Sequence, residues 1–380
     1  MKLLHVSPTY YPATNFGGPI FSTYALCNGM AALPGIELRV LTSDAAGRRL
    51  KERLEVGAFP VRYSPGYDVY FTKRRLGTAM APGLLRYLPS MVRWADAVLL
   101  TGTYSFPTIP TLIACRVFGK PLVWSPRGAL QATQEWTGVR RRHLKRTWEA
   151  ACTLARPRRC VLHVTAEIER RLSCERLPEF DAVIIPNAVD FPQDLPSRQW
   201  KPGGSLRLMF ISRIDPKKGL DILLRVMPTS NCPMTLDVYG DGDSAYVKSM
   251  WKLVKSLGLT DRVRFHGHVV GEAKRSAFLN ADVMVLPTHS ENFGMVVAES
   301  LAHGVPAIVS RGAPWAGLDA RGCGRWIENS PRGWSEAIRN MYDADLEAMG
   351  QRGREWMQAE FVWSRTAERM VELFGNLMAK

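Results

Sequence analysis

The chain has 380 residues, of which 46% are hydrophobic and 22% charged, a composition that excludes a disordered polypeptide. Because a single hydrophobic core stops growing at about 250 to 300 residues, we expect two domains. The formal net charge of +15 indicates an anionic partner, which could be a phosphate-bearing substrate, a membrane surface or a nucleic acid.

The N-terminal apolar run, Met1 to Ser7, leads into a loop that contains Pro and Gly. It is too short for the hydrophobic core of a signal peptide, and no stretch reaches the roughly 18 apolar residues of a membrane span. The 7 cysteines are scattered, without a Cys-x-x-Cys pair, which argues against a disulfide framework or a zinc knuckle. We therefore expect a cytoplasmic protein, soluble or peripheral on the inner face of the membrane.

Short runs rich in Val, Ile and Leu alternate with helical patterns, which is typical of parallel sheets covered by helices on both faces. In the first half, these runs predict strands at residues 2–7, 37–43, 97–102, 122–126, 160–165 and 182–187. A Pro-rich stretch without periodicity then occupies residues 191–204. The remaining predicted strands are residues 206–212, 234–240, 263–267, 283–287 and 307–310, and roughly the last 50 residues have a helical pattern.

This order of elements predicts an α/β fold with two Rossmann-like, doubly wound domains that face each other across a cleft. We expect the first domain at residues 1–190, the second at residues 191–360, and a C-terminal helix at residues 361–380 that packs back toward the first domain. In open α/β sheets, ligands bind at the carboxyl ends of the strands, so we expect the functional residues there.

A polar loop follows the strand that ends at Pro287 and carries Glu291, Asn292 and Phe293 before a helix begins near Gly294. The free N–H groups at the start of such a helix form an anion site. Glu299 lies within this helix, which is apolar on every side, and we expect it to be buried. A buried carboxylate needs donors, and either ribose hydroxyls or an internal basic side chain could supply them.

A second group of polar residues, which includes Arg213 and Lys218, follows the strand at residues 206–212. Arg213 offers a planar fork for phosphate oxygens and Lys218 a point charge beside a helix start, so the two could clamp a diphosphate. The alternative is that the Lys-Lys pair at the helix start, Lys217 and Lys218, is only solvated surface. After the first strand, Gly17 and Gly18 precede a helix and would let a backbone approach a ligand closely. These groups belong to different predicted domains and could converge only across the cleft.

The combined pattern resembles the retaining glycosyltransferases of family GT4, which have the GT-B fold. Glu291 and Glu299 are similar to the E-x7-E motif of that family, and Asn292, Phe293 and Gly294 lie inside it. Arg213 with Lys218 resembles the family's diphosphate-binding pair, and Gly17-Gly18 its N-terminal glycine loop. The segment Ile185 to Asp190 resembles the junction between the domains, with Ala188 in place of glycine.

The resemblance implies a donor site made of these residues. Glu291 and the backbone of Phe293 and Gly294 would contact the sugar, Glu299 the ribose, and the loop from Gly267 to Val269 the base. Arg213 and Lys218 would neutralise the diphosphate as the sugar departs. The donor would be a UDP- or GDP-sugar, and the reaction a hexosyl transfer with retained anomeric configuration.

The strand at residues 122–126 is followed by Arg127, Gly128, Ala129 and Leu130, which with Pro126 resemble the P-R-G-M-L motif of a surface-polysaccharide subgroup. Arg127 could bind acceptor phosphate or donor, or form a salt bridge under the loop. The subgroup implies a glycan or polyprenyl-diphosphate-linked acceptor in lipopolysaccharide, capsule or exopolysaccharide synthesis. His163 on the next strand is expected to be a satisfied core histidine.

No cofactor and no metal ion are expected, because donors in this fold generally need no divalent ion. His266 and His268 alternate on one strand, but a third ligand is not apparent, and this argues against a metal site. We expect chelation to leave activity intact.

Basic residues concentrate in the first domain, at residues 73–75, 140–142, 145–146 and 156–159. Leu144, Trp148 and Cys152 recur every four residues beside this charge, so the helix could lie on an anionic membrane. Alternatively, the apolar stripe packs on the sheet and the charges are solvated.

Three other functions remain open. A basic nucleic-acid-binding protein would need recognition motifs that this chain lacks, so no nucleic-acid partner is expected. A hydrolase could use Glu291 and Glu299 as its acid/base pair, although it would not need the surrounding cations. A sugar-nucleotide epimerase of the same fold is the third alternative.

Overall fold

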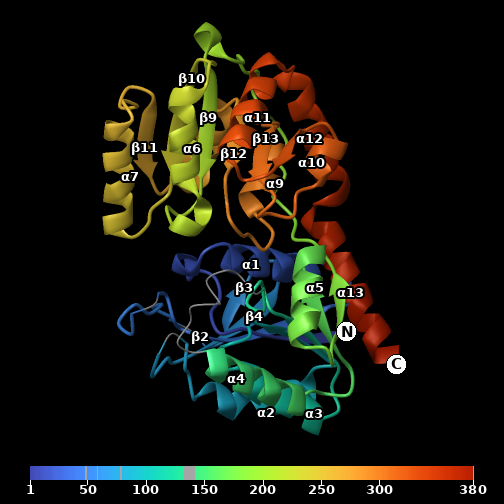
Figure 1. The fold of residues 1–380 in the computed structure, drawn as a ribbon. Helices are drawn as coiled ribbons and strands as arrows, with labels where there is room; N and C mark the ends of the chain where they lie inside the picture. The colour runs from blue at the N-terminus through green and yellow to red at the C-terminus, as the bar shows by residue number, and fades with distance from the viewer. Residues whose placement is uncertain (48, 58, 78, 132–141, 380) are drawn as a thin grey trace. The chain divides into compact units, whose positions relative to one another are not determined.

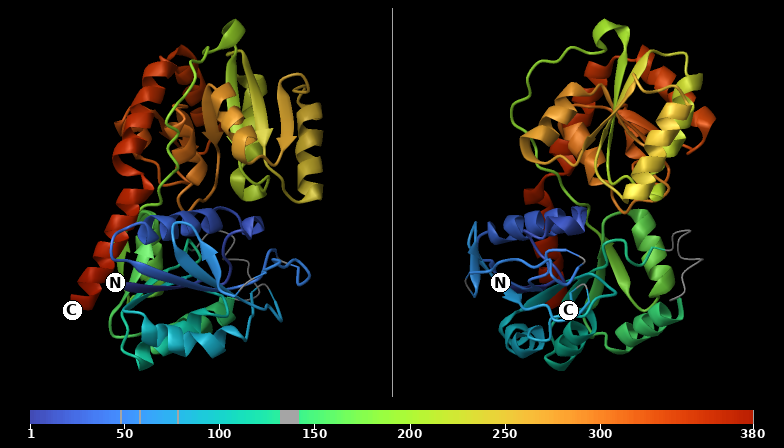
Figure 2. Two further views of the ribbon diagram at one scale, coloured as in Figure 1. Left: turned by 180° about the vertical axis from the view of Figure 1, so that it is seen from behind. Right: turned by 90° about the vertical axis from the view of Figure 1, so that its left-hand side faces the viewer.

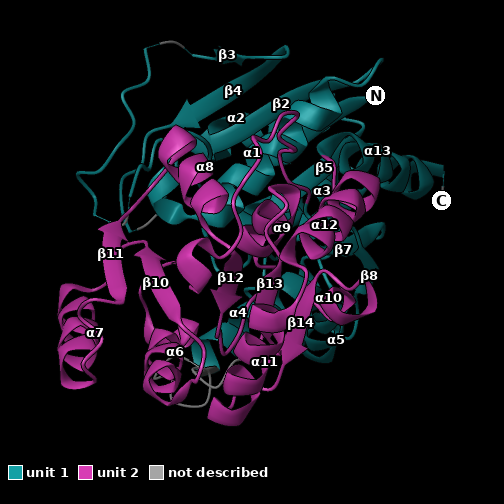
Figure 3. Ribbon diagram, turned by 90° about the horizontal axis from the view of Figure 1, so that it is seen from above, with its two compact units in different colours: residues 1–187, 363–380 teal, residues 188–362 magenta. Residues whose placement is uncertain are grey.

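The computed structural model describes residues 1–379 except residues 48, 58, 78 and 132–141. The chain forms two compact units: residues 1–187 with 363–380 make up unit 1, and residues 188–362 make up unit 2 (Figure 3). The change of unit after Asn187 lies next to the predicted boundary at residue 190, and the segment from Trp363 belongs to unit 1.

Unit 1 contains an eight-stranded sheet with the order β3-β4-β2-β1-β5-β6-β7-β8. All neighbouring strands in it are parallel except β3 and β4. The strands are β1 (Lys2–Val6), β2 (Glu37–Ser43), β3 (Val61–Tyr63), β4 (Tyr67–Thr72), β5 (Ala97–Thr101), β6 (Leu122–Ser125), β7 (Cys160–Val164) and β8 (Asp181–Ile184).

Helices pack on both faces of this sheet (Figure 1). One apolar core contains side chains of α1 and α13, and the other contains side chains of α2, α3 and α4. The helices of unit 1 are η1 (Thr14–Phe16), α1 (Gly18–Ala31), α2 (Leu84–Trp94), α3 (Thr108–Val117), α4 (Arg142–Leu154), α5 (Glu167–Arg176) and α13 (Trp363–Ala379). The C-terminal helix α13 therefore packs against α1, where a Cβ on Gly29 would lie 2.9 Å from that of Ala367.

Unit 2 contains an all-parallel, six-stranded sheet with the order β11-β10-β9-β12-β13-β14. The strands are β9 (Leu206–Ile211), β10 (Met234–Tyr239), β11 (Val263–Gly267), β12 (Val283–Leu286), β13 (Ala307–Ser310) and β14 (Gly324–Ile327). The helices are η3 (Pro202–Gly204), η4 (Pro216–Lys218), α6 (Leu220–Val226), η5 (Met227–Thr229), α7 (Ser244–Ser256), α8 (Gly271–Asn280), α9 (Met295–Ala302), α10 (Gly317–Ala320), α11 (Pro331–Asp343) and α12 (Leu346–Glu360). Figure 2 shows helices on both faces of this sheet.

The central strand β9 explains why the strands are continuous apolar runs. Leu208 and Phe210 belong to one core of unit 2, whereas Met209 and Ile211 belong to the core on the other face. Successive side chains of a strand point to opposite faces, and both faces here are covered by helices. The fully covered positions Leu208 to Ile211 are accordingly all apolar, whereas Arg207 near the start of β9 is only partly buried.

The predicted α/β class with two doubly wound domains is confirmed, and each predicted strand is present. Strands β3, β4 and β14 were not predicted. β4 has the alternating burial of a strand with one covered face, β3 pairs antiparallel at the edge, and β14 is a four-residue edge strand. Continuous apolar runs indicate strands that are covered on both faces, and β3, β4 and β14 do not contain such runs. Within the described parts of the chain, no helix is long and apolar enough to cross a bilayer.

The strand order of unit 2 reverses between β9 and β12, so the loops after these two strands diverge from a common point. Gly219, which ends the loop after β9, has a φ of +66°. A Cβ at Gly219 would lie 2.1 Å from the carbonyl oxygen of Pro287 at the end of β12. Only glycine permits both this conformation and this close approach.

We predict that Gly219→Ala destabilises unit 2 more than Gly258→Ala does. Gly258 has nearly the same φ, +67°, but a Cβ there would meet no atom within 4 Å. Both variants lose about 1 kcal/mol to the left-handed conformation, and Gly219→Ala loses about 1 to 3 kcal/mol more to the clash. The free energy of unfolding in urea measures the difference, and equal losses would contradict the proposed contact.

Candidate functional site

The loops that follow β9 and β12 are joined by hydrogen bonds at the point where the strand order reverses. The amide of His289 donates to the carbonyl of Lys217 at 2.8 Å, and the hydroxyl of Thr288 donates to the same oxygen at 3.2 Å. Ligands of open α/β sheets bind outside the carboxyl ends of the strands at such a reversal. Six of the predicted site residues lie on these two loops: Arg213, Lys218, Glu291, Asn292, Phe293 and Gly294.

Lys218 and Glu291 form an ion pair between the two loops, from Nζ to Oε1. The side chain of Lys218 is 8% exposed and that of Glu291 is 20% exposed. The interpretation of Lys218 as solvated surface is therefore wrong. A buried ammonium group needs a partner, and Glu291 supplies it where a ligand would otherwise have to do so.

Arg213, by contrast, is exposed at the start of the loop after β9. Its side chain makes no hydrogen bond or ion pair within the part of the chain that the structure describes. Asp215, two residues on, caps the short helix η4 by accepting from the amide of Lys217 at 3.0 Å. The guanidinium of Arg213 thus stands beside a fixed loop with its donors available to an anion.

Hydrogen bonds to the loop after β13 fix the start of α9 and the loop before it. The indole of Trp315 donates to the carbonyl of Phe293 at 2.5 Å, and the amide of Glu291 donates to the carbonyl of Gly312 at 2.8 Å. Phe293 is only 6% exposed and packs in the apolar core. The side chain and the carbonyl of Phe293 thus take part in the fold. Of the backbone groups of Phe293 that were predicted to contact a sugar, the N–H is the one that is left. Gly294 takes a φ of +81° as the helix begins, and no side chain in the described residues caps α9.

Glu299 lies on a partly open face of α9, so the prediction that it is buried on every side is wrong. Met295 and Val296 are also only partly buried. The side chain of Glu299 is 22% exposed, and its Oε1 pairs with Nζ of Lys274 on α8 at 2.6 Å. Its Oε2 is shielded from solvent and has no partner among the described residues. A helix with an apolar sequence can still have one exposed face where no neighbouring element packs against it.

Lys274 was not found from the sequence, although it pairs with a predicted site residue. It lies in the first turn of α8, directly after the loop that contains Val269. Val269 is partly buried and packs against the same apolar core as α9. An internal basic side chain was one of the expected partners of Glu299, and this lysine is the one observed.

His266 on β11 contacts two neighbouring side chains. Its ring stacks on Tyr239 with centroids 4.5 Å apart, and its Nε2 lies 2.6 Å from Oδ1 of Asp237. The described residues contain no group of three or more His, Cys, Asp or Glu side chains placed to hold a metal ion.

In unit 1, Gly17 and Gly18 form the entry to α1 after β1. Gly17 has a φ of +82°, and a Cβ at either position would meet no atom within 4 Å. The backbone here is open on the side where a side chain would stand. This accessibility is what the predicted close approach of a ligand requires.

Arg127 follows β6 with a φ of +55°, a left-handed conformation that a non-glycine residue rarely adopts. Its Nη1 donates to Oδ1 of Asn187 at 2.6 Å, and its Nε has no partner among the described residues. Burial lowers the pKa of Arg127, and the nearby carboxylate of Glu169 opposes this effect. In place of the predicted salt bridge under the loop, Arg127 has a hydrogen bond to the side-chain amide of Asn187, and the carboxylate of Glu169 lies nearby.

The buried polar groups around Arg127 include two histidines. His163 contacts the hydroxyl of Ser125 at 3.0 Å and the carbonyl of Ile185 at 2.9 Å, so the prediction of a satisfied core histidine is confirmed. His5 contacts the hydroxyl of Thr101 at 3.0 Å and was not predicted. Burial, followed by the charge of Arg127, lowers the pKa of each to about 3. Both rings are therefore neutral near pH 7.

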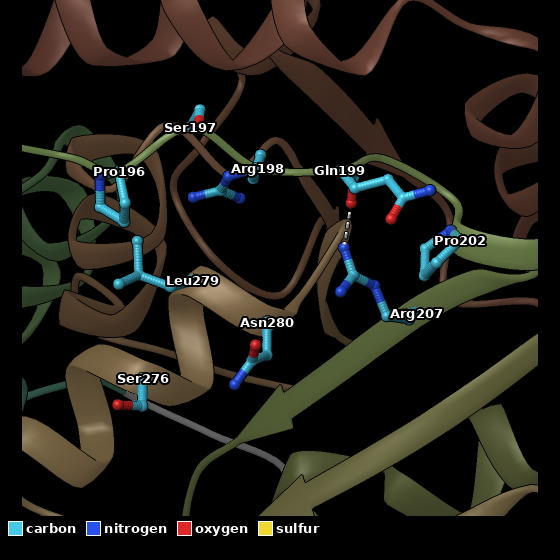
Figure 4. A pocket seen from close by; sticks show the side chains of 9 residues that line it. All are labelled: Pro196, Ser197, Arg198, Gln199, Pro202, Arg207, Ser276, Leu279 and Asn280. Carbon is cyan, nitrogen blue, oxygen red and sulfur yellow. Dashed lines mark hydrogen bonds between the residues drawn. The ribbon is translucent and has the colours of Figure 1, made fainter.

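A pocket of about 350 Å³ lies elsewhere in unit 2, near the amino ends of β9 and β12 (Figure 4). Its two arginines are occupied, since Arg198 donates to the carbonyls of Ala281 and His303, and Arg207 pairs with Asp282. None of the candidate residues lines this pocket. It is therefore not part of the site at the carboxyl ends.

The curated relatives of this chain include a D-inositol 3-phosphate glycosyltransferase of Kineococcus radiotolerans, 29% identical over 246 residues. That match covers 57% of this chain and 56% of the relative, so the chain spans about half the length of the curated relatives that it matches first.

Two solved structures share the fold over nearly the full length. Anabaena Alr3699/HepE in complex with UDP superposes with a TM-score of 0.72 at 15% identity, covering 99% of this chain and 100% of that one. WaaG, a glycosyltransferase involved in lipopolysaccharide biosynthesis, superposes with a TM-score of 0.68 at 14% identity, covering 98% and 99%.

Two family models match consecutive parts of the chain. The model of Glycosyltransferase Family 4 matches residues 16–192, and the model of Glycosyl transferases group 1 matches residues 193–356. The matches correspond closely to the two compact units, each with a doubly wound sheet. The chain therefore belongs to the family 4, group 1 glycosyltransferases with the GT-B type of fold.

Proposed function

We propose that this protein is a retaining hexosyltransferase that uses a UDP- or GDP-sugar as donor. The observation that carries the proposal is the set of charged residues where the strand order of unit 2 reverses. Arg213 and Lys218 follow β9, Glu291 follows β12, and Glu299 lies on the helix that comes next. The complex of Anabaena Alr3699/HepE with UDP supports a nucleotide donor.

The proposed roles follow from the chemistry of the leaving group. When the bond between the sugar and the phosphate breaks, negative charge develops on the diphosphate, and preorganised cations stabilise it. Arg213, with free donors, and Lys218 supply this positive charge. Lys218 is paired with Glu291, so a donor that engages Lys218 would also bring its sugar next to Glu291.

Glu299 would accept hydrogen bonds from the ribose, and Val269 would contact the base. Asn292 and the N–H groups of Phe293 and Gly294 would face the sugar. The departing phosphate would take the proton of the acceptor hydroxyl on the same face of the sugar, which retains the anomeric configuration. Gly17, Gly18 and Arg127 of unit 1 would serve the acceptor or the donor.

The acceptor is proposed to be a glycan or a polyprenyl-diphosphate-linked saccharide of lipopolysaccharide, capsule or exopolysaccharide synthesis. The P-R-G-A-L segment at residues 126–130 and the likeness to WaaG support this proposal. A sugar-nucleotide epimerase would form a new nucleotide-sugar without any acceptor. Product analysis with and without an acceptor distinguishes the two activities.

Contact with an anionic membrane is proposed through α3 and α4 of unit 1, and only in part through the predicted stripe. Trp148 donates to the carbonyl of Thr103, and Cys152 is fully buried, so these two residues of the stripe pack inward, whereas Leu144 is 67% exposed. Leu154 at the end of α4 and Val117 at the end of α3 are instead 75% and 70% exposed. Arg116 joins the two helix ends by donating to the carbonyl of Leu154. Arg140 and Arg141 of the predicted basic cluster lie outside the described residues.

We predict that UDP or GDP raises the melting temperature of the protein and that Glu299→Ala greatly reduces this shift. A ligand that binds only the native state stabilises it by mass action. Glu272→Ala is the matched control, because this carboxylate of α8 is 74% exposed. If neither nucleotide shifts the transition and Glu299→Ala behaves like the wild type, the donor site is wrongly assigned.

We predict that EDTA leaves sugar transfer unchanged. Arg213 and Lys218 provide the charge that a divalent ion would otherwise supply to the diphosphate. The rate of transfer before and after chelation is the measurement. Complete loss of activity that magnesium restores would disprove independence of metal ions.

We predict that the protein floats with vesicles of anionic lipid and not with neutral vesicles, because exposed apolar groups and cations act together at a charged bilayer. The double variant Val117→Glu with Leu154→Glu should lose this binding. Leu76→Glu, which changes another exposed residue of unit 1 outside α3 and α4, is the control. Equal flotation with both lipids would remove the membrane proposal.

A further inference from the structure

Helices α8 and α9 contact each other through two successive pairs of side chains. Lys274 of α8 pairs with Glu299 of α9, with Nζ and Oε1 2.6 Å apart. One turn further along both helices, Phe278 stacks on His303 with ring centroids 4.7 Å apart. Because residues four apart lie on the same face of a helix, the second pair fixes the spacing at which the first pair meets.

The backbone around Glu299 is fixed as well. The carbonyl of Glu299 accepts from Nδ1 of His303 at 2.7 Å and from the amide of the same residue at 3.1 Å. The carbonyl of His303 accepts in turn from Arg198 at 2.8 Å. The carboxylate of Glu299 is therefore carried by a helix end that has little freedom to move.

The two oxygens of this carboxylate have different surroundings. Oε1 is engaged by Lys274, whereas Oε2 is shielded from solvent and has no partner in the described residues. A shielded carboxylate oxygen without a donor is unfavourable, which makes the pair with Lys274 the main compensation for this carboxylate. The side chain as a whole is 22% exposed, so a ligand can contact its exposed part.

We infer that Lys274 is a positioning residue, which holds the Glu299 carboxylate by one oxygen so that the carboxylate accepts from the vicinal hydroxyls of a nucleoside diphosphate. This inference rests on the proposed function. A bound nucleotide would cover Glu299 and remove its remaining water, which is costly for an unpaired carboxylate. Lys274 offsets that cost and also fixes the orientation of the carboxylate.

A direct contact between Lys274 and the phosphates is the competing role, since an ammonium group also binds phosphate. The two roles differ in which part of the ligand they need. A positioning role acts through Glu299 and therefore requires ribose hydroxyls. A phosphate contact would be equally strong for a nucleotide that lacks them.

The experiment measures by calorimetry how UDP and 2′,3′-dideoxy-UDP bind to the full chain, or GDP and its dideoxy analogue if GDP gives the larger thermal shift. The wild type is compared with Lys274→Met and Lys274→Arg, and Lys252→Met, at an exposed lysine of α7, is the control. A melting temperature of Lys274→Met near that of the wild type confirms that the variant folds.

We expect Lys274→Met to weaken binding of the ribose nucleotide roughly 10- to 100-fold, the range of a hydrogen bond to a charged group. Binding of the dideoxy analogue should stay within about twofold of the wild type. Lys274→Arg should restore most of the affinity. Equal weakening of both nucleotides, or no weakening of either, would overturn the inference. A wild type that binds no nucleotide would instead contradict the proposed function itself.

Discussion

The site depends on the close approach of two backbone loops in unit 2, where the strand order reverses between β9 and β12. The approach is possible only because residue 219 has no side chain, and a Cβ there would meet the carbonyl of Pro287 at 2.1 Å. It brings Lys218 within reach of Glu291 across 73 residues of sequence. Without it, neither charge would have its partner, and both would be too costly to hold near the core.

Some charged side chains of the candidate site in unit 2 have a partner of opposite charge, and one does not. This difference determines which side chain is available to a ligand. Lys218 and Glu299 are each engaged by an opposite charge, whereas Arg213 is exposed and free among the described residues. In the proposed function, an approaching diphosphate would meet an available guanidinium before it competes for the buried ammonium group. Binding of the diphosphate would then require Lys218 to exchange its ion partner, which would link phosphate recognition to the position of Glu291.

Unit 1 buries a group of polar side chains around Arg127. Burial lowers the pKa values of His5 and His163 to about 3 and raises the pKa of the Glu169 carboxyl. Arg127 carries an unusual positive φ, and the carboxyl of Glu169 accepts from the amides of Gly128 and Thr165 beside it. The role proposed for Arg127 toward an anionic ligand group would use the charge of its guanidinium.

The sequence by itself determined the fold class, the strands covered on both faces and the residues that could carry charge to a phosphate. These follow from local patterns, because a strand buried on both faces must be apolar at each position. Only the tertiary structure decided which face of α9 stays open and that Lys274 is the partner of Glu299. Both depend on how α8 and α9 pack, and residues 25 positions apart leave no periodic signal of that packing in the sequence. The edge strands β3 and β14 were not predicted for a related reason. They are strands because they pair with a neighbouring strand, and their own composition does not indicate it.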